Sequence, residues 1–197
     1  MKNILRWLRE SYELCGFIRD VRGRGDCNIR LNTKIKNRKK ISIKGSISLG
    51  ENCKLLCWKE YTSSSNNQFL DPRLEIGYNF RATRNLTIQC AGHTCIGNDV
   101  LVSSDVFIID YNHCLDPRNA NYLDGELFVK EVFIDDGAWI GNNVVILPGA
   151  RIGKKAVIGA GSVVTGTIDD YCIAVGNPAR VIKRWDFSSN KWINVKR

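Results

Sequence analysis

The sequence has few of the residues on which metal sites and disulfide frameworks depend. Only two of its 197 residues are histidine, His93 and His113, and its eight cysteines include no Cys-x-x-Cys pair. A zinc site needs clustered cysteine and histidine ligands, so none is expected. We expect the cysteines to be reduced, and Cys53, Cys90 and Cys95 to serve as small buried apolar residues.

Long apolar runs are also missing. The first twenty residues, MKNILRWLRESYELCGFIRD, are interrupted by Arg6, Arg9, Glu10 and Glu13, unlike the apolar centre of a secretory signal. No stretch is long and uncharged enough for a membrane-spanning helix. With 44% apolar and 25% charged residues, the sequence predicts a folded cytoplasmic protein.

Positive charge is concentrated at the start of the chain. Residues 1–40 hold twelve Lys/Arg and four Asp/Glu, and so carry +8 of the total charge of +9. One interpretation is attraction to an anionic partner, such as a membrane surface, a lipid pyrophosphate or an acidic glycan. The other is a solvated amphipathic helix followed by a basic strand face. Nucleic acid is disfavoured, because these residues include no recognition helix and no aromatic platform.

A six-residue period dominates the rest of the sequence. Six residues fit neither a helical repeat nor strand alternation, but they make one flat side of a triangular coil. Three sides give a turn of about 18 residues, and successive turns stack as parallel strands. The period appears at Ile134, Ile140, Ile146, Ile152, Ile158 and Val164, with a small or compact residue four positions after each of the first five. It also appears at Ile29, Ile35, Ile41, Ile47 and Cys53, at Ile76, Ala82 and Ile88, and, after a two-residue shift, at Cys90, Ile96, Val102 and Ile108.

The period divides the chain into a coil domain with two flanking segments. Residues 1–26 predict a helix, 27–184 the coils, and 185–197 a tail whose FSSNKW centre favours a hairpin with Trp185 beside Trp192. The expected apolar stripe of the helix is Ile4, Leu8, Ser11 or Tyr12, Cys15 and Ile18. Insertions at 58–73 and 109–132 interrupt the coils. A coil closes without extra residues, so long insertions favour a functional role.

Several motifs give the coils a family resemblance. The segments NLTI (85–88), WIGNNV (139–144), IGAGSVVT (158–165) and GNPARVIK (176–183) resemble the hexapeptide-repeat acyltransferases, in particular the galactoside and maltose acetyltransferases. DYNH (110–113) resembles the O-acetyltransferases of bacterial surface polysaccharides. The resemblance implies an all-β, left-handed parallel β-helix with an extended catalytic loop, to which the sequence pattern adds a short N-terminal helix and a hairpin-like tail. It also implies a homotrimer with active sites between neighbouring chains, and acetyl-coenzyme A as the donor.

The resemblance also implies a single catalytic histidine on the extended loop. Moving an acetyl group from a thioester to a sugar hydroxyl requires a base, and neutral imidazole suits that role at cytoplasmic pH. His113 lies on the second insertion and is the candidate; the alternative is a surface histidine with a packing or capping contact. His93 is expected to be structural. Cys114 is not expected to be a nucleophile, because adjacent side chains diverge and direct transfer needs no acyl-enzyme.

Further site residues follow from the resemblance. The backbone N–H at Asn142, or at Gly141, would meet the oxyanion. Trp139 would donate a hydrogen bond or form a wall of the acceptor pocket, or else is a rim aromatic packed on the loop. Asn85 would contact acceptor or donor, or is a simple turn residue. From its place on the loop, Glu126, or else the loop carbonyls, would orient the imidazole, and Glu126 is also a candidate contact to the acceptor.

Coenzyme A has its own candidate residues. Its pantetheine arm would run along the coil edge at Ala160 and Thr165, with Gly141 and Asn142 nearby. Arg180 and Lys183 would bind the nucleotide phosphates. The alternative is ordinary surface charge, which we favour for Arg184.

The sequence therefore predicts an acetyl-coenzyme A-dependent O-acetyltransferase that needs no metal for catalysis. Its acceptor would be a sugar hydroxyl of a bacterial surface polysaccharide or its precursor, acylated by direct transfer. The alternative is N-acetylation of a nucleotide-linked amino sugar with the same fold and donor. A carbonic anhydrase of β-helix type needs three histidine ligands, which two histidines do not supply. A non-catalytic scaffold is disfavoured by the Asn–His loop and the corner residues.

Overall fold

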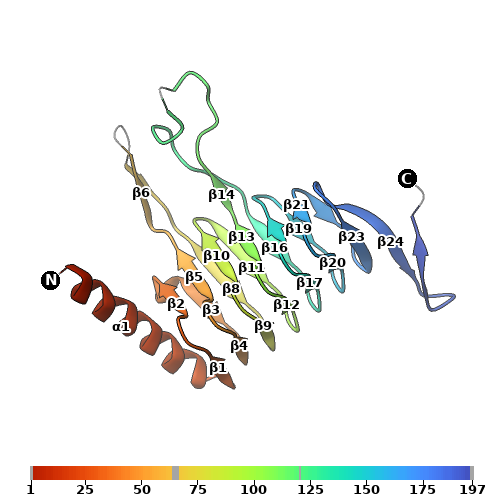
Figure 1. Cartoon of the computed structure of the whole chain (residues 1–197), viewed down its shortest axis with the longest axis horizontal. Helices are drawn as coiled ribbons and strands as arrows, with labels where there is room; N and C mark the ends of the chain where they lie inside the picture. The colour runs from red at the N-terminus through yellow and green to blue at the C-terminus, as the bar shows by residue number, and fades with distance from the viewer. Residues whose placement is uncertain (1, 64–66, 120, 196–197) are drawn as a thin grey trace.

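A computed structural model describes residues 2–63, 67–119 and 121–195, and its architecture is a parallel β-helix with one helix at its N-terminal end (Figure 1). Helix α1 (Lys2–Arg22) precedes the coils. The chain then passes in turn through three parallel sheets, called here A, B and C. The expected class, a left-handed parallel β-helix with an N-terminal helix, an extended loop and a C-terminal hairpin, is confirmed.

Each sheet takes one strand from every coil. Sheet A contains β1 (Cys27–Ile29), β4 (Ile47–Leu49), β9 (Phe80–Ala82), β12 (Leu101–Val102), β17 (Trp139–Ile140), β20 (Val157–Ile158) and β23 (Cys172–Val175). Sheet B contains β2 (Lys34–Lys36), β5 (Lys54–Cys57), β10 (Thr87–Cys90), β13 (Phe107–Ile109), β18 (Val145–Ile146) and β21 (Val163–Val164). Sheet C contains β3 (Ile41–Ile43), β8 (Arg73–Ile76), β11 (His93–Ile96), β16 (Val132–Ile134), β19 (Arg151–Ile152) and β22 (Thr167–Ile168).

The six-residue period marks the interior of the coils. From Ile134 to Val164 all six periodic aliphatic residues are at most 2% exposed, and the five small or compact residues between them are fully buried. Two upstream positions, Ile29 and Ile41, are only partly buried. Strands present alternate residues to the core, so both Ile41 and Ile43 of β3 point inward. Ile43 is the more deeply buried of the two, and its register partner Ile76 is also buried.

The corners between sheets A and B repeat one backbone conformation. Asn52, Asn85, Asp105 and Asn143 have φ between 53° and 63°, in the left-handed region that Asn and Asp tolerate better than other side chains. The Asn85 side chain donates to the Asp105 carboxylate on the next coil, 2.6 Å away. Asn85 is therefore a turn residue that also links two coils.

Helix α1 packs on the first coil with a different face from the one expected. Phe17 and Val21 are 2% exposed, while Ile4, Leu8 and Tyr12 are between 51% and 68% exposed. The two buried residues are four apart and belong to the same core cluster as the coil residues, whereas Ile18 of the expected stripe is only partly buried. No helix among the described residues is long and apolar enough to cross a membrane.

The parallel coils end earlier than the sequence predicts. They stop at β23, whereas the expected boundary was residue 184, because the chain reverses around Gly176, where φ is 102°. Strand β24 (Arg180–Asp186) then returns antiparallel to β23 and forms a hairpin with β25 (Lys191–Asn194). Trp185 and Trp192 pack edge to face with ring centroids 5.3 Å apart, as expected for the tail; residues 196–197 of the tail lie outside the described residues.

Candidate active site

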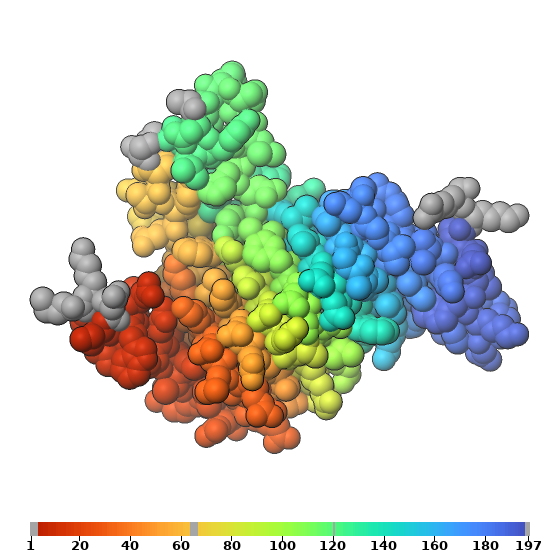
Figure 2. Space-filling view, in the orientation of Figure 1, coloured from red at the N-terminus to blue at the C-terminus, as the bar shows by residue number. Residues whose placement is uncertain are grey.

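Both insertions leave the β-helix at the corner between sheets B and C. The first separates β5 from β8 and contains the hairpin β6 (Glu60–Thr62) and β7 (Asn67–Phe69). The second separates β13 from β16 and begins and ends with the paired strands β14 (Tyr111–Asn112) and β15 (Phe128–Val129). One uninterrupted coil, with β10 and β11, lies between them. The two insertions therefore project on the same side of the molecule, next to each other (Figures 1 and 2).

A buried carboxylate anchors the second insertion. Asp110 is fully buried and accepts hydrogen bonds from Ala91 N at 2.7 Å, Gly92 N at 3.2 Å and Thr94 Oγ1 at 3.1 Å. Ala91 and Gly92 form the tight turn between β10 and β11 of the preceding coil, and Thr94 lies on β11. Because the carboxylate satisfies all three, it fixes the start of the loop to the coil.

Tyr111 extends this anchor. Its hydroxyl donates to Gln89 Oε1 at 2.5 Å. Burial, followed by the negative charge of Asp110, raises the pKa of Tyr111 to about 12. The phenol is therefore protonated and acts as a donor across the physiological pH range.

His113 lies two residues further along, on the exposed part of the loop. Its ring centroid is 5.5 Å from that of Tyr61 on β6, with the planes inclined by 60°. The Tyr61 hydroxyl donates to Leu123 O at 2.6 Å. The first insertion thus contacts both the histidine and the far side of its loop.

Gln68 makes the second contact between the insertions. Its Nε2 donates to Leu127 O at 3.2 Å, and its Oε1 accepts from Leu127 N at 2.7 Å. Leu127 is 6% exposed, so this pair of bonds holds a buried point of the loop. Sequence reasoning missed both Tyr61 and Gln68. Counting coils would have shown that the two insertions share a corner, but not which of their side chains meet.

Glu126 and Cys114, also on the loop, do not contact the His113 imidazole through any hydrogen bond among the described residues. Glu126 is exposed, and the described residues include no hydrogen bond between it and His113. The Cys114 Sγ accepts a hydrogen bond from Asn119 Nδ2 at 3.3 Å and lies against Gly125. Cys114 therefore packs within the loop.

The residues expected around the oxyanion lie at the corner between sheets A and B. Asn142 Oδ1 accepts from Ser104 N at 3.0 Å, while within the described part of the chain the Asn142 N–H has no acceptor. Trp139 points outward from β17, is 49% exposed and donates to Ser103 Oγ at 3.2 Å. Gly141 is buried, and a Cβ there would lie 2.7 Å from Ile158 O, so coil stacking alone requires this glycine.

The expected coenzyme A residues are distributed along the last coils. Ala160 is exposed at the A–B corner, next to Asn142, whose carbonyl accepts from Gly161 N. Thr165 is exposed at the corner between sheets B and C, directly after β21. Arg180 and Lys183 lie on β24, and Arg184 forms an ion pair with Asp169 at 2.6 Å.

A single chain does not bring these residues together with His113. The histidine projects from the B–C corner, whereas Asn85, Asn142 and Ala160 lie at the A–B corner. The two corners are separated by one side of the coil. A side of about six residues, at the rise of an extended strand, is about 15–20 Å long. His113 and these three corner residues therefore lie on opposite edges of sheet B.

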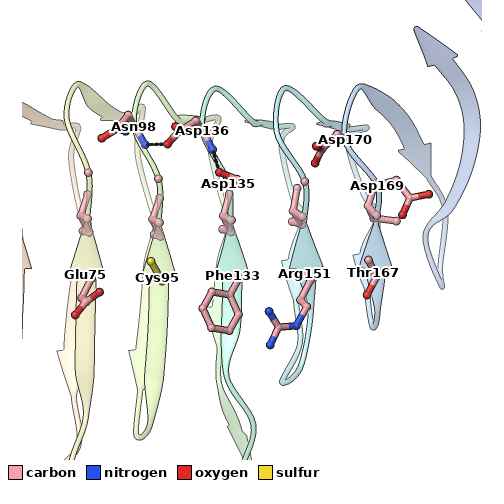
Figure 3. A pocket seen from close by; sticks show the side chains of 18 of the residues that line it. Glu75, Cys95, Asn98, Phe133, Asp135, Asp136, Arg151, Thr167, Asp169 and Asp170 are labelled. Atoms are coloured by element: carbon pink, nitrogen blue, oxygen red, sulfur yellow. Dashed lines mark hydrogen bonds between the residues drawn. The ribbon is translucent and has the colours of Figure 1, made fainter. Parts of the chain in front are cut away.

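A large cleft lies elsewhere, along the outer face of sheet C (Figure 3). Its volume is about 910 Å³, and Glu75, Cys95, Phe133, Arg151 and Thr167 line it from successive coils. None of the sequence-predicted site residues lines this cleft. It is separate from the His113 loop.

Comparison with known proteins gives the family. A family model for "Bacterial transferase hexapeptide (six repeats)" matches residues 131–166. The chain is 32% identical to the Escherichia coli (strain K12) protein described as putative lipopolysaccharide biosynthesis O-acetyl transferase WbbJ, over 94% of this chain and 96% of that protein. It is 34% identical to the galactoside O-acetyltransferase of the same organism, over 77% of this chain and 70% of the relative.

A solved structure shares the fold. AntD, an N-acyltransferase from Bacillus cereus solved with dTDP-4-amino-4,6-dideoxyglucose and coenzyme A, superposes with a TM-score of 0.67. At 18% identity it covers 84% of this chain and 86% of its own. The coils, the sequence period and these relatives agree, and the chain belongs to the hexapeptide-repeat transferases and is an acyltransferase.

Proposed function

We propose that this protein transfers an acetyl group from acetyl-coenzyme A to a sugar hydroxyl of a bacterial surface polysaccharide or its precursor. The observation that carries the proposal is the placement of His113, exposed on a loop that Asp110 anchors and the first insertion braces. Such a placement presents the imidazole to a substrate while restricting its motion. The similarity to a lipopolysaccharide biosynthesis O-acetyltransferase over nearly the whole chain supports the class of acceptor.

The proposed reaction needs one base and one set of N–H donors. The acceptor oxygen attacks the thioester carbonyl carbon while His113 removes the hydroxyl proton. The Asn142 N–H, which has no acceptor among the described residues, would stabilise the negative carbonyl oxygen of the tetrahedral intermediate. The C–S bond then breaks, the ester remains on the sugar, and the imidazolium returns its proton to the coenzyme A sulfur.

The site is proposed to lie between chains of a homotrimer. His113 and Asn142 occupy different corners of one coil stack, so they meet only if the loop of one chain reaches the A–B corner of another. Each chain would then supply His113 with Tyr61 to one site, and Asn142, Trp139, Asn85 and Ala160 to the next. Light scattering on the purified protein measures the assembly, and a monomer that is fully active contradicts it.

A donor and acceptor panel tests the activity. We expect acetyl-coenzyme A to release its thiol with a surface-glycan fragment or lipid-linked repeat unit, with the acetyl ester found on the glycan by mass spectrometry. Nucleotide-linked amino sugars form the second arm of the panel. Release only with an amino sugar, yielding an amide, would replace the O-acetyl proposal with N-acetylation.

The exposed face of α1 supports a proposed contact with an anionic membrane. Ile4, Leu5, Trp7, Leu8 and Tyr12 are all more than half exposed, within the basic first forty residues. Apolar side chains combined with nearby cations are typical of helices that lie in a membrane interface. This contact would bring the enzyme to a lipid-linked acceptor at the inner face of the membrane.

Vesicle sedimentation measures this contact. We expect the protein to bind phosphatidylglycerol vesicles several-fold better than phosphatidylcholine vesicles, and less well at high salt. The double change Trp7→Ser with Leu8→Ser should abolish binding. Leu31→Ser is the matched control, because Leu31 is 78% exposed but lies outside the helix. Equal binding of both variants argues against the helix as the contact.

The bracing of the loop predicts an effect of Gln68 on catalysis. Gln68→Ala removes both hydrogen bonds to Leu127 and should lower kcat about 10-fold, because small displacements of a catalytic group are costly. Asn67→Ala, at an exposed neighbour on the same strand, is the control. Hydrogen exchange of the amides at 121–129 should quicken only in the Gln68 variant. Identical kcat values for the two variants would show that the hairpin does not position the loop.

A further inference from the structure

We infer that the sheet C face carries a site for a zinc-like divalent transition-metal ion, with Glu75, His93 and Cys95 as ligands. Their candidate donor atoms, one carboxylate oxygen, one imidazole nitrogen and the thiol sulfur, all lie within 4.8 Å of one another. Strands β8 and β11 are neighbours, and Cys95 is the register partner of Glu75. His93 and Cys95 alternate with the buried Thr94 and Ile96, so both point outward on the same face.

The imidazole supplies the observation that points to an ion. His93 Nε2 is buried and has no hydrogen-bond partner among the described residues. It lies 3.5 Å from Glu75 Oε2, longer than the 2.7–2.9 Å or so of a charge-assisted hydrogen bond. A tetrahedral ion with bonds of about 2.0–2.3 Å places its ligand atoms about 3.3–3.6 Å apart. The spacing therefore suits a nitrogen and an oxygen that share a metal ion.

The other ring nitrogen has the partner that metal-binding histidines commonly have. Nδ1 is 3.5 Å from Glu131 Oε1, and the second oxygen of Glu131 is 4.0 Å from Arg151. Because Glu75 Oε2 is equally far from Nε2, the ion itself would fix the tautomer: with Nε2 bound to the metal, the ring proton stays on Nδ1, facing Glu131. The Phe133 ring, with its centroid 5.5 Å away and at 84°, further fixes the imidazole plane.

The cleft supplies access and the remaining coordination position. Glu75 and Cys95 line the cleft of about 910 Å³, and Figure 3 shows their side chains at the same level on adjacent strands. Three protein ligands and one open position, filled by water, are a common arrangement for zinc. Carboxylate, imidazole and thiolate together suit a borderline ion better than magnesium or calcium, which prefer oxygen ligands only.

The position of the site indicates its role. The site links the coil of β8 to the coil of β11. It also contacts the next coil through Glu131, the residue that immediately precedes β16. Bound metal would therefore stabilise the coils from which the His113 loop emerges. The inference does not depend on the proposed acyl transfer, because metal binding is measured without any substrate.

Cobalt serves as the spectroscopic probe. Tag-free protein, treated with a chelator and dialysed, is titrated with Co²⁺ and then with Zn²⁺. We expect one Co²⁺ per chain with a thiolate-to-cobalt charge-transfer band, displacement by Zn²⁺, and a rise in Tm of about 5 °C at saturating Zn²⁺. Absence of the band in the wild-type protein overturns the inference.

Substitutions assign the ligands. Cys95→Ser should remove the charge-transfer band, and His93→Gln and Glu75→Gln should weaken Zn²⁺ binding at least 100-fold. Glu131→Gln changes a half-exposed carboxylate and leaves the three ligands intact, and it should weaken Zn²⁺ binding by about 10-fold. This variant keeps the test valid if a ligand variant misfolds. Cys15→Ser and His113→Ala are controls with an exposed thiol and an exposed imidazole away from the cluster. A band that survives Cys95→Ser, or is lost in Cys15→Ser, rules the assigned site out.

Discussion

Replacing His113 by alanine is expected to lower the rate of acetyl transfer by on the order of 10²–10⁴-fold with the productive acceptor. The imidazole is exposed on the loop, and its ring contact is with Tyr61. Removing it should leave the fold unchanged, because the side chain is exposed. The loss should appear in kcat, measured as coenzyme A release under saturating donor, with little change in donor binding.

The matched control for this change lies on the same loop. Arg118→Ala removes an exposed side chain whose partner, Asp116, is two residues away. It should retain wild-type activity, and both variants should have the wild-type oligomeric state and Tm. If His113→Ala is as active as Arg118→Ala, His113 is not the base. The second histidine, His93, would then be the remaining imidazole to test.

Removing the Asp110 carboxylate is expected to produce the largest loss of stability. Asp110→Ala leaves Ala91 N, Gly92 N and Thr94 Oγ1 without their acceptor in a buried place. Bonds to a charged group contribute about 1.5–3 kcal/mol each, and the unpaired donors add a desolvation cost, so a loss of about 3 kcal/mol or more follows. Urea unfolding at fixed protein concentration measures it. Activity should fall as well, because the loop loses its anchor.

Two further variants separate charge from the hydrogen bonds. Asp110→Asn keeps one acceptor oxygen and should be intermediate in stability. Asp116→Ala removes a partly exposed carboxylate of the same loop, which pairs with the exposed Arg118, and should hardly alter the unfolding midpoint. An Asp110→Ala protein that unfolds at the wild-type urea concentration would show that the carboxylate does not hold the turn.

The sequence alone predicts the coils well, for a simple reason. Each periodic aliphatic side chain has to enter a narrow interior, so the period is a direct record of which residues are buried. Ile140, Ile146 and Ile158 are fully buried as expected. The same logic fails for Ile41. Strand β3 has three residues, so Ile41 and Ile43 both point inward, and Ile43 is the more deeply buried of the two.

The helix illustrates a different limit. Its apolar stripe is readable in the sequence, but Phe17 and Val21 make the contact with the first coil instead. Which face is buried depends on the shape of the surface that the helix meets, and periodicity carries no information about that surface. Ile4 and Leu8 are left exposed, where we propose that they contact a membrane.

The sequence by itself determined the β-helix and the two insertions, and it singled out His113 and Asn142 as candidates for the proposed chemistry. The tertiary structure decided how these parts meet, because contacts between distant segments depend on how many coils separate them and on which corner each segment leaves. It placed Tyr61 and Gln68 against the His113 loop, and separated that loop from the A–B corner within one chain. It also aligned Glu75 with Cys95 and His93 across two coils, a neighbourhood that strand register creates.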